Sequence, residues 1–204
     1  LFNKPFPKLR PKKRYYQHPI YYMGNHLNFF THGDSIKIPS YTAELDYELE
    51  IAAVISKPLK NASIKQVEDA IAGFVILNDF SARDVQMSEM ESGFGPVKSK
   101  NFGNAISATF TPKHVLIEKL DTLNTKVIVN DKTVAIGSTK NMYYSMQEAI
   151  AYASWEEQLH PYELFGSGTI PSCTGIENGV MLNAGDVITL EIEGIGQLTN
   201  NVIS

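Results

Sequence analysis

Residues 45–55 of the chain, LDYELEIAAVI, combine the apolar composition of a buried β-strand with an acid at every second position. A strand places alternate side chains on opposite faces, so Asp46, Glu48 and Glu50 are predicted to share one face. If water covers that face, the stretch is an edge strand. If protein covers it, burial and mutual repulsion raise the pKa values of the carboxylates unless a cation holds them. The stretch therefore predicts either an exposed sheet edge or a cation site.

The spacing of these acids is compatible with a metal site, but not for all three at once. Carboxylates two residues apart on a strand lie roughly 6.6 Å apart along the backbone, so both can reach one ion. The three acids span about 13 Å, so one of them is predicted to be structural or solvent-facing. A further ligand is predicted in ILNDFSARDVQ (76–86), where Asp79 follows an apolar run. On the residues alone, these acids fit either ordinary exposed carboxylates or oxygen ligands of Mg²⁺.

The remainder of the chain is rich in turn residues and β-branched runs. Two helices are predicted by capping boxes, in which a serine is followed three residues later by Gln or Glu, over residues 63–72 and 145–158. Strands are predicted over 74–79, 126–130, 133–137 and, in two parts, 187–203. Many strands with two or three short helices favour a single α+β domain that is largely β.

Composition excludes several classes of protein. The 204 residues are 43% hydrophobic and 20% charged, as in an ordinary folded chain, and the net charge of −4 argues against a broad basic surface for nucleic acid. The short basic stretch KLRPKKR (8–14) is predicted to end a solvated N-terminal arm, residues 1–14, before a domain over 15–204. The lone Cys173 excludes an internal disulfide framework. No apolar run reaches the roughly 20 residues of a membrane span, so a cytoplasmic protein is expected.

Five segments give the chain a resemblance to the fumarylacetoacetate hydrolase family, and they occur in the family's order. They are LDYELEIAAVI (45–55), GFVILNDFSARDVQ (73–86), GPVKSKNFG (95–103), LFGSGTI (164–170) and LNAGDVITLEIEGIGQLTNNV (182–202). The resemblance runs from about residue 15 to the end. It implies a roll of mixed β-sheets, a site for Mg²⁺, Mn²⁺ or Ca²⁺, and usually a homodimer. It also implies activity on small 2-oxo acids or 1,3-dicarbonyl compounds.

Residue by residue, the resemblance places the E-x-E metal ligands on Glu48 and Glu50 and the third carboxylate on Asp79. Asp46 is then the acid left outside the metal site. The resemblance further implies a set of catalytic or substrate-facing residues, which are Arg83, Gln86, Lys100, Gly168 and Thr169.

Some of these roles remain open. Lys98 lies two residues from Lys100 and competes for the same assignment. Arg83 either clamps a substrate carboxylate or orders the metal-binding carboxylates from behind. Gly166 and Gly168 either let the backbone approach a ligand or form a simple turn. The aromatic segment YYQHPIYYMGNHLNFF (15–30) either faces a second subunit or lines the core.

A hydrolase needs a base that activates water, and no histidine of the chain matches the catalytic histidine of the family. Similar proteins carry that histidine on a helical lid between a proline-rich segment, here PFPKLRPKK (5–13), and a strand, here YYQHP (15–19). In this chain the two run together at Lys13–Arg14. We therefore expect either a deletion or a missing mobile piece of about 20 residues, longer than ordinary connections. A backbone break beside an open cleft is expected at this point.

Three functional interpretations follow. The first is a metal-dependent hydrolase of a C–C bond in a small oxo acid or diketone. The second is a metal-dependent decarboxylase, isomerase or tautomerase of an oxo acid such as oxaloacetate, because polarisation by the metal then suffices without an activated water. The third is a binding protein that keeps the fold and the metal site without turnover.

Overall fold

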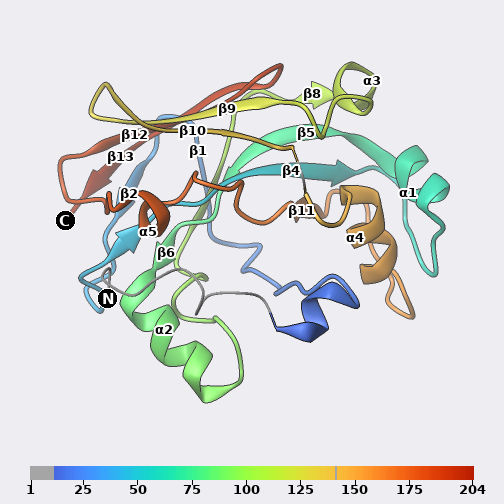
Figure 1. Cartoon of the computed structure of the whole chain (residues 1–204), viewed down its shortest axis with the longest axis horizontal. Coiled ribbons are helices and arrows are strands. Elements are labelled where there is room, and N and C mark those ends of the chain that lie inside the picture. The colour runs from blue at the N-terminus through green and yellow to red at the C-terminus, as the bar shows by residue number, and fades with distance from the viewer. Residues whose placement is uncertain (1–11, 141) are drawn as a thin grey trace.

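Two mixed β-sheets stacked on one hydrophobic core make up most of the protein (Figure 1). The computed structural model describes residues 12–140 and 142–204. The first sheet has the strand order β1-β7-β5-β4-β11, with β8 pairing to β5. Its strands are β1 (Phe29–Thr31), β4 (Leu49–Ile55), β5 (Ile71–Asn78), β7 (Asn104–Ile106), β8 (Thr111–Pro112) and β11 (Leu164–Gly166).

The second sheet has the order β10-β9-β12-β13-β2, and a short pair, β3 with β6, stands apart from both sheets. Its strands are β2 (Ser35–Lys37), β9 (Asn124–Val129), β10 (Lys132–Ser138), β12 (Val187–Ile192) and β13 (Gly196–Ile203), and the separate pair is β3 (Leu45–Asp46) with β6 (Ser81–Ala82). The β1–β7 and β13–β2 pairs are parallel, whereas the other pairs are antiparallel.

Short helices lie at the ends of the sheets, and α2 projects away from them (Figure 1). The helices are α1 (Ile64–Ala70), α2 (Arg83–Ser92), α3 (Lys113–Leu116), α4 (Met146–Ala153) and α5 (Gly175–Asn178), with a 3-10 helix η2 (Lys13–Tyr16). Strands in mixed sheets with few short helices confirm the predicted α+β, largely β fold class. Within the described residues, no helix has the length and apolar character needed to cross a bilayer.

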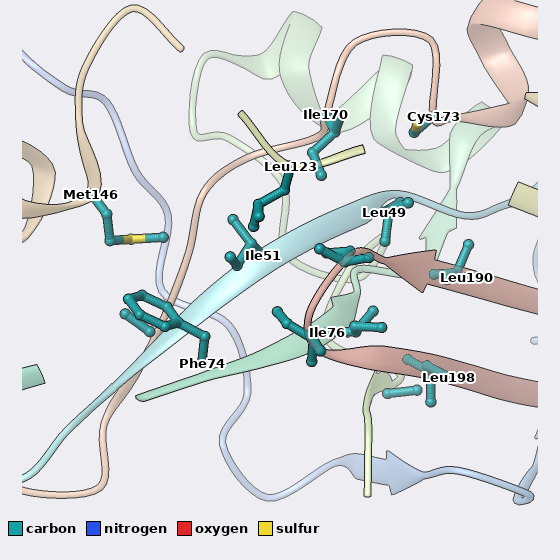
Figure 2. Packing of buried hydrophobic residues seen from close by; sticks show 14 of the residues in the cluster. Leu49, Ile51, Phe74, Ile76, Leu123, Met146, Ile170, Cys173, Leu190 and Leu198 are labelled. Atoms are coloured by element: carbon teal, nitrogen blue, oxygen red, sulfur yellow. The ribbon is translucent and has the colours of Figure 1, made fainter. Parts of the chain in front are cut away.

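Apolar side chains from both sheets meet in the core (Figure 2). Phe74 and Ile76 of β5 and Ile51 of β4 are fully buried in it. They share this core with Leu190 of β12 and Leu198 of β13. The opposite face of β4 and β5 carries a second, smaller buried cluster. The two central strands are therefore covered on both faces, and their polar ends are held in fixed positions.

The predicted helices and hairpin are present with shifted ends. Both capping boxes form, at Ser63 and at Ser145. Helix α1 does not continue to Gly73, because Ile71 adopts an extended backbone and enters β5 directly. Helix α4 ends at Ala153 instead of near residue 158. The β9–β10 hairpin turns at residues 130–131, both of which have positive φ, as in the two-residue turns that match strand twist.

The LDYELEIAAVI stretch is not one continuous strand. Strand β3 ends at Asp46, Tyr47 lies outside any strand, and Glu48 makes only an isolated bridge before β4 begins. Every residue from Leu45 to Ala53 is buried, and β4 lies between β5 and β11. The acidic face is covered by protein, so the edge-strand alternative is wrong.

The expectation of a backbone break at Lys13–Arg14 is also wrong. Both residues belong to η2, and the backbone N–H of Tyr15 donates to the carbonyl of Lys12 at 2.9 Å across this junction. The Arg14 guanidinium then donates to the hydroxyl of Tyr152, 3.2 Å away. Most of the arm predicted over residues 1–14 lies outside the described residues.

Candidate active site

The three acids predicted to bind a metal converge where β4 begins and β5 ends. Glu48 directly precedes β4, Glu50 is the second residue of that strand, and Asp79 directly follows β5. The antiparallel register pairs Leu49 with Asn78, which brings the N–H of Asp79 to 3.1 Å from the carbonyl oxygen of Glu48. One carboxylate oxygen of each acid lies within 4.8 Å of the others, and all three side chains are buried. These residues are called the acid cluster below.

Asp46 lies outside the acid cluster and has a structural role. Its carboxylate accepts a hydrogen bond from Nε of Arg83 at 2.7 Å. It also accepts the backbone N–H groups of Gly175 and Ile176, at 2.7 and 3.1 Å, where α5 begins. These donors satisfy the fully buried carboxylate within the protein, without a metal. The three acids were predicted to span too great a length for all of them to bind one ion, and the position of Asp46 agrees with this.

Arg83 lies behind the acid cluster as the first residue of α2. Its Nη2 donates to Oε1 of Glu48 at 2.6 Å and to the Thr174 hydroxyl at 3.0 Å. Its Nη1 donates to the side-chain oxygen of Gln86, one helical turn further along. Together with the Nε bond to Asp46, every nitrogen of the guanidinium has a protein acceptor. Arg83 therefore bonds two buried carboxylates, and the amide nitrogen of the half-buried Gln86 has no hydrogen-bond partner among the described residues.

Lys100, and not Lys98, reaches the acid cluster. The Lys100 ammonium lies 2.7 Å from Oε2 of Glu48 and 2.7 Å from Oδ2 of Asp79, and the residue is 2% exposed. Lys98 is exposed, and its ammonium lies 5.6 Å from the centre of the Tyr41 ring. The two lysines therefore occupy different environments, although only one residue separates them.

Glu89 on α2 holds the loop that precedes Lys100. Its carboxylate accepts the backbone N–H groups of Val97, Lys98 and Ser99, at 2.9, 2.7 and 3.2 Å, and the Ser99 hydroxyl at 2.6 Å. Burial acts to raise the pKa of Glu89, but these donors outweigh it and lower the pKa to about 2. The carboxylate stays ionised at neutral pH and fixes the backbone next to Lys100.

The loop that follows β11 approaches Glu50 closely. The N–H of Gly168, which has φ +78°, donates to Oε2 of Glu50 at 3.0 Å. A Cβ at Gly166 would lie 2.2 Å from the same Glu50 oxygen. Thr169 follows on this loop and is half-buried. The two glycines thus let the backbone reach a carboxylate of the acid cluster, which the simple-turn alternative did not include.

Gly166→Ala is expected to displace the Glu50 carboxylate, because the new methyl group would also lie 2.9 Å from Cδ2 of Leu77. We expect the affinity for Mg²⁺ to fall by at least about tenfold, the loss typical of disturbed groups around a metal site. Isothermal titration with Mg²⁺ measures this change. Gly24→Ala is the control, since a Cβ there meets nothing closer than 3.5 Å. Equal Mg²⁺ affinities in the two variants would contradict the role given to Gly166.

Two residues at the site have no sequence signal. Tyr22 donates its hydroxyl proton to Oδ2 of Asp79 at 2.6 Å, yet it belongs to the aromatic segment interpreted as interface or core. Thr174 donates to Asp46 at 2.9 Å while accepting from Arg83, and it follows an unremarkable turn. Their contacts span more than 50 residues of sequence, so no local pattern could have found them.

The charges of the site are unevenly balanced. Burial acts to raise the pKa of Glu48, but Lys100 and Arg83 outweigh it and lower this pKa to about 2. Burial, then the charges of Asp79 and Glu48, raise the pKa of Glu50 well above its ordinary value. Burial also raises the pKa of Asp79, although Lys100 offsets part of the effect. The ionised form of Glu50 is therefore disfavoured unless a further cation neutralises the cluster.

The acid cluster fits a divalent cation. With Asp46 the site has four carboxyl groups, against two cationic side chains, so full ionisation leaves two negative charges over. Oδ1 of Asp79 is buried and has no hydrogen-bond partner within the described part of the chain. Carboxylate oxygens are the ligands that Mg²⁺ and Mn²⁺ prefer. The charge and the unpartnered oxygen both match such an ion.

The histidines lie elsewhere. The His18 ring stacks on Tyr152 with centroids 5.2 Å apart, and Nδ1 of His32 accepts the N–H of Thr199 at 3.1 Å. No histidine hydrogen-bonds the acid cluster within the described residues. The remaining three are exposed: His26, His114 and His160.

Comparisons with known proteins agree on one family. The family described as "Fumarylacetoacetate (FAA) hydrolase C-terminal" matches residues 7–203. A fumarylacetoacetate hydrolase domain-containing protein 2 homolog of Dictyostelium discoideum is 33% identical over 183 residues, which cover 83% of this chain and 58% of the relative. A mitochondrial oxaloacetate tautomerase of Xenopus laevis is 32% identical over 174 residues, covering 83% of this chain and 53% of the relative. The chain thus spans little more than half the length of these two relatives.

Solved structures share the fold. A fumarylacetoacetate hydrolase of Exiguobacterium antarcticum superposes with a TM-score of 0.78 at 26% identity, covering 87% of this chain and 63% of that one. A fumarylpyruvate hydrolase of Pseudomonas aeruginosa, in complex with Mn²⁺ and pyruvate, gives 0.72 at 22% identity and covers 86% and 73%. At this identity, the second likeness shows the fold alone.

Proposed function

The chain belongs to the fumarylacetoacetate hydrolase family, and we propose that it is a divalent-metal-dependent enzyme acting on a small 2-oxo acid or 1,3-dicarbonyl compound. The observation that carries the proposal is the buried acid cluster with the Lys100 ammonium 2.7 Å from two of its members. Burying several charges together carries a large desolvation penalty in the free energy of folding. Such clusters are typical of sites that bind a cation or catalyse a reaction.

We propose that Glu48, Glu50 and Asp79 hold the metal, Mg²⁺ in the first place and Mn²⁺ or Ca²⁺ as alternatives. The unpartnered Oδ1 of Asp79 and the excess of negative charge support this assignment. The fold neighbour from Pseudomonas aeruginosa was solved with Mn²⁺, which is compatible with this assignment. When bound, such a cation polarises the carbonyl group of an oxo acid as a Lewis acid.

The proposed role of Lys100 is to stabilise negative charge. Removing a proton, a carboxylate or an acyl group next to a carbonyl leaves an enolate, and an ammonium in a buried site stabilises that charge strongly. Arg83 is proposed to position Glu48 and Asp46, since all its nitrogens already bind protein acceptors. The free amide nitrogen of Gln86 and the loop of Gly168 and Thr169 are proposed to orient the substrate.

Two reaction types share this enolate. Tautomerisation, isomerisation and decarboxylation need no activated water, whereas hydrolysis of a C–C bond does. The histidines, which lie away from the acid cluster, support the first type. The tautomerase among the relatives supports it as well. C–C hydrolysis is the second candidate, favoured by the two hydrolases with the same fold.

A turnover screen tests the proposal. Oxaloacetate, an acylpyruvate and a fumarylacetoacetate-like diketone are each incubated with the chain plus Mg²⁺, and again after chelation. Mg²⁺-dependent loss of the enol absorbance without cleavage products identifies a tautomerase, whereas release of a carboxylic acid together with a shorter ketone or oxo acid identifies a hydrolase. Mg²⁺ binding without any turnover would favour the silent binding protein.

We also propose that the chain forms a homodimer through its N-terminal aromatic segment. Several side chains of residues 15–30 are exposed, including Ile20 at 60%, Met23 at 82% and Leu27 at 78%, which argues against the alternative that they line the core. Exposed apolar side chains along one segment suit burial against a second subunit. Sedimentation at micromolar concentration is expected to give twice the chain mass of 22.7 kDa. A monomer under these conditions would contradict the proposal.

A further inference from the structure

Tyr22 extends from the protein surface to the acid cluster. The residue is 37% exposed, and its neighbours Tyr21 and Met23 are more exposed still, at 48% and 82%. Its hydroxyl nevertheless donates to Oδ2 of the buried Asp79 at 2.6 Å. The Lys100 ammonium lies 5.9 Å from the centre of the Tyr22 ring, within the range of a cation–π contact. The ring therefore covers the site on one side.

The two oxygens of the Asp79 carboxylate have different surroundings. Oδ2 accepts both the Tyr22 hydroxyl and the Lys100 ammonium, the latter at 2.7 Å. Oδ1 is buried and has no partner within the described residues. Two donors on one oxygen fix the rotation of the carboxyl group, so the other oxygen stays available in one orientation.

We propose that Tyr22 is a positioning residue of the metal site, whose hydroxyl holds Asp79 so that Oδ1 serves as the metal ligand. The inference rests on the proposed metal-dependent function and adds a residue to it. Groups that hydrogen-bond a metal-binding carboxylate set its orientation, and their loss weakens metal binding about 10- to 100-fold. Burial, then the charge of Asp79, raise the pKa of the Tyr22 hydroxyl, so it keeps its proton and remains a donor.

Tyr22→Phe tests the inference, because it removes the hydroxyl and keeps the ring over Lys100. We expect the dissociation constant for Mg²⁺, measured by isothermal titration on the whole chain, to rise at least about tenfold. The melting temperature in chelator is expected to change little, which separates a positioning role from general packing. Tyr21→Phe is the matched control: its hydroxyl donates to Glu157 at 3.3 Å on the surface, and its Mg²⁺ affinity is expected to equal that of the wild type.

Mg²⁺ affinity of Tyr22→Phe within about twofold of the wild type would overturn the inference and leave the proposed function standing. A large drop in the melting temperature in chelator, with affinity unchanged, would likewise overturn it and assign Tyr22 to packing. A wild-type chain that binds no Mg²⁺ would overturn the proposed function and this inference together.

Discussion

Lys100→Met is expected to lower kcat by about 10²- to 10³-fold, the effect of removing one group that stabilises charge in a transition state. The enolate charge develops only as the reaction proceeds, so substrate binding is expected to suffer less than turnover. Mg²⁺ affinity is expected to change less than kcat, because the ammonium bonds Oδ2 of Asp79 and leaves Oδ1 without a partner among the described residues. Steady-state kinetics and Mg²⁺ titration measure the two quantities separately.

Lys98→Met is the matched control. Its ammonium lies over the exposed Tyr41 ring, so the substitution is expected to leave kcat unchanged. Lys100→Met removes one partner of a buried ion pair, which costs about 3–5 kcal/mol in folding free energy, so both variants are compared at saturating Mg²⁺. If Lys98→Met lost activity and Lys100→Met kept it, the assignment of Lys100 would be wrong.

Glu50→Gln is expected to abolish the stabilisation by Mg²⁺ without lowering the stability of the metal-free protein. Glu50 has no ion-pair partner in the described part of the chain, and burial with the neighbouring carboxylates disfavours its ionised form, which glutamine cannot adopt. In the wild type, Mg²⁺ at 100 times its dissociation constant adds about 2.7 kcal/mol to the free energy of unfolding. Thermal melting with Mg²⁺ and with chelator measures both terms.

Glu48→Gln is the comparison variant, because this residue pairs with both Arg83 and Lys100. It is expected to lower stability in chelator as well as Mg²⁺ binding.

The stability of the metal-free protein is also expected to depend on pH through Glu50. Because the folded pKa of Glu50 lies above the ordinary 4.5, the folded metal-free chain keeps a proton that the unfolded chain releases. Its stability therefore falls as the pH rises above 4.5, and Glu50→Gln removes this part of the fall. A Glu50→Gln variant with undiminished Mg²⁺ stabilisation would contradict the ligand set.

Local rules predicted those parts of the protein that depend on neighbouring residues. Alternation placed Glu48 and Glu50 together, and the capping boxes at Ser63 and Ser145 predicted where two helices begin. Helix ends were less predictable, because the transition at Ile71 depends on the pairing of β5 with β4 rather than on a stop signal. The interruption at Tyr47 has the same origin, since Glu48 bridges to a residue 126 positions later.

The features that depend on contacts between distant parts of the sequence could not be predicted from local patterns. Helix α2 lacks a capping side chain at Ala82, and its first residue, Arg83, is held by buried carboxylates from other elements. The place of Asp79 beside Glu48 follows from strand pairing. Its position after an apolar run indicated a candidate ligand but did not show which strand it would lie beside. Tyr22 bonds a partner 57 residues away and looks like any aromatic residue of its segment.

Helix α2 has a consequence for how the protein can change over evolution. It begins with Arg83, and Glu89, less than two turns later, fixes the backbone of Val97 to Ser99 immediately before Lys100. The two cationic side chains of the site, Arg83 and Lys100, are thereby positioned by one short helix. The loop between them, with Gly93 and Gly95 at positive φ and Phe94 93% exposed, lies outside this anchor. Insertions in this exposed loop can be accommodated at the surface while the Lys100 ammonium stays in place.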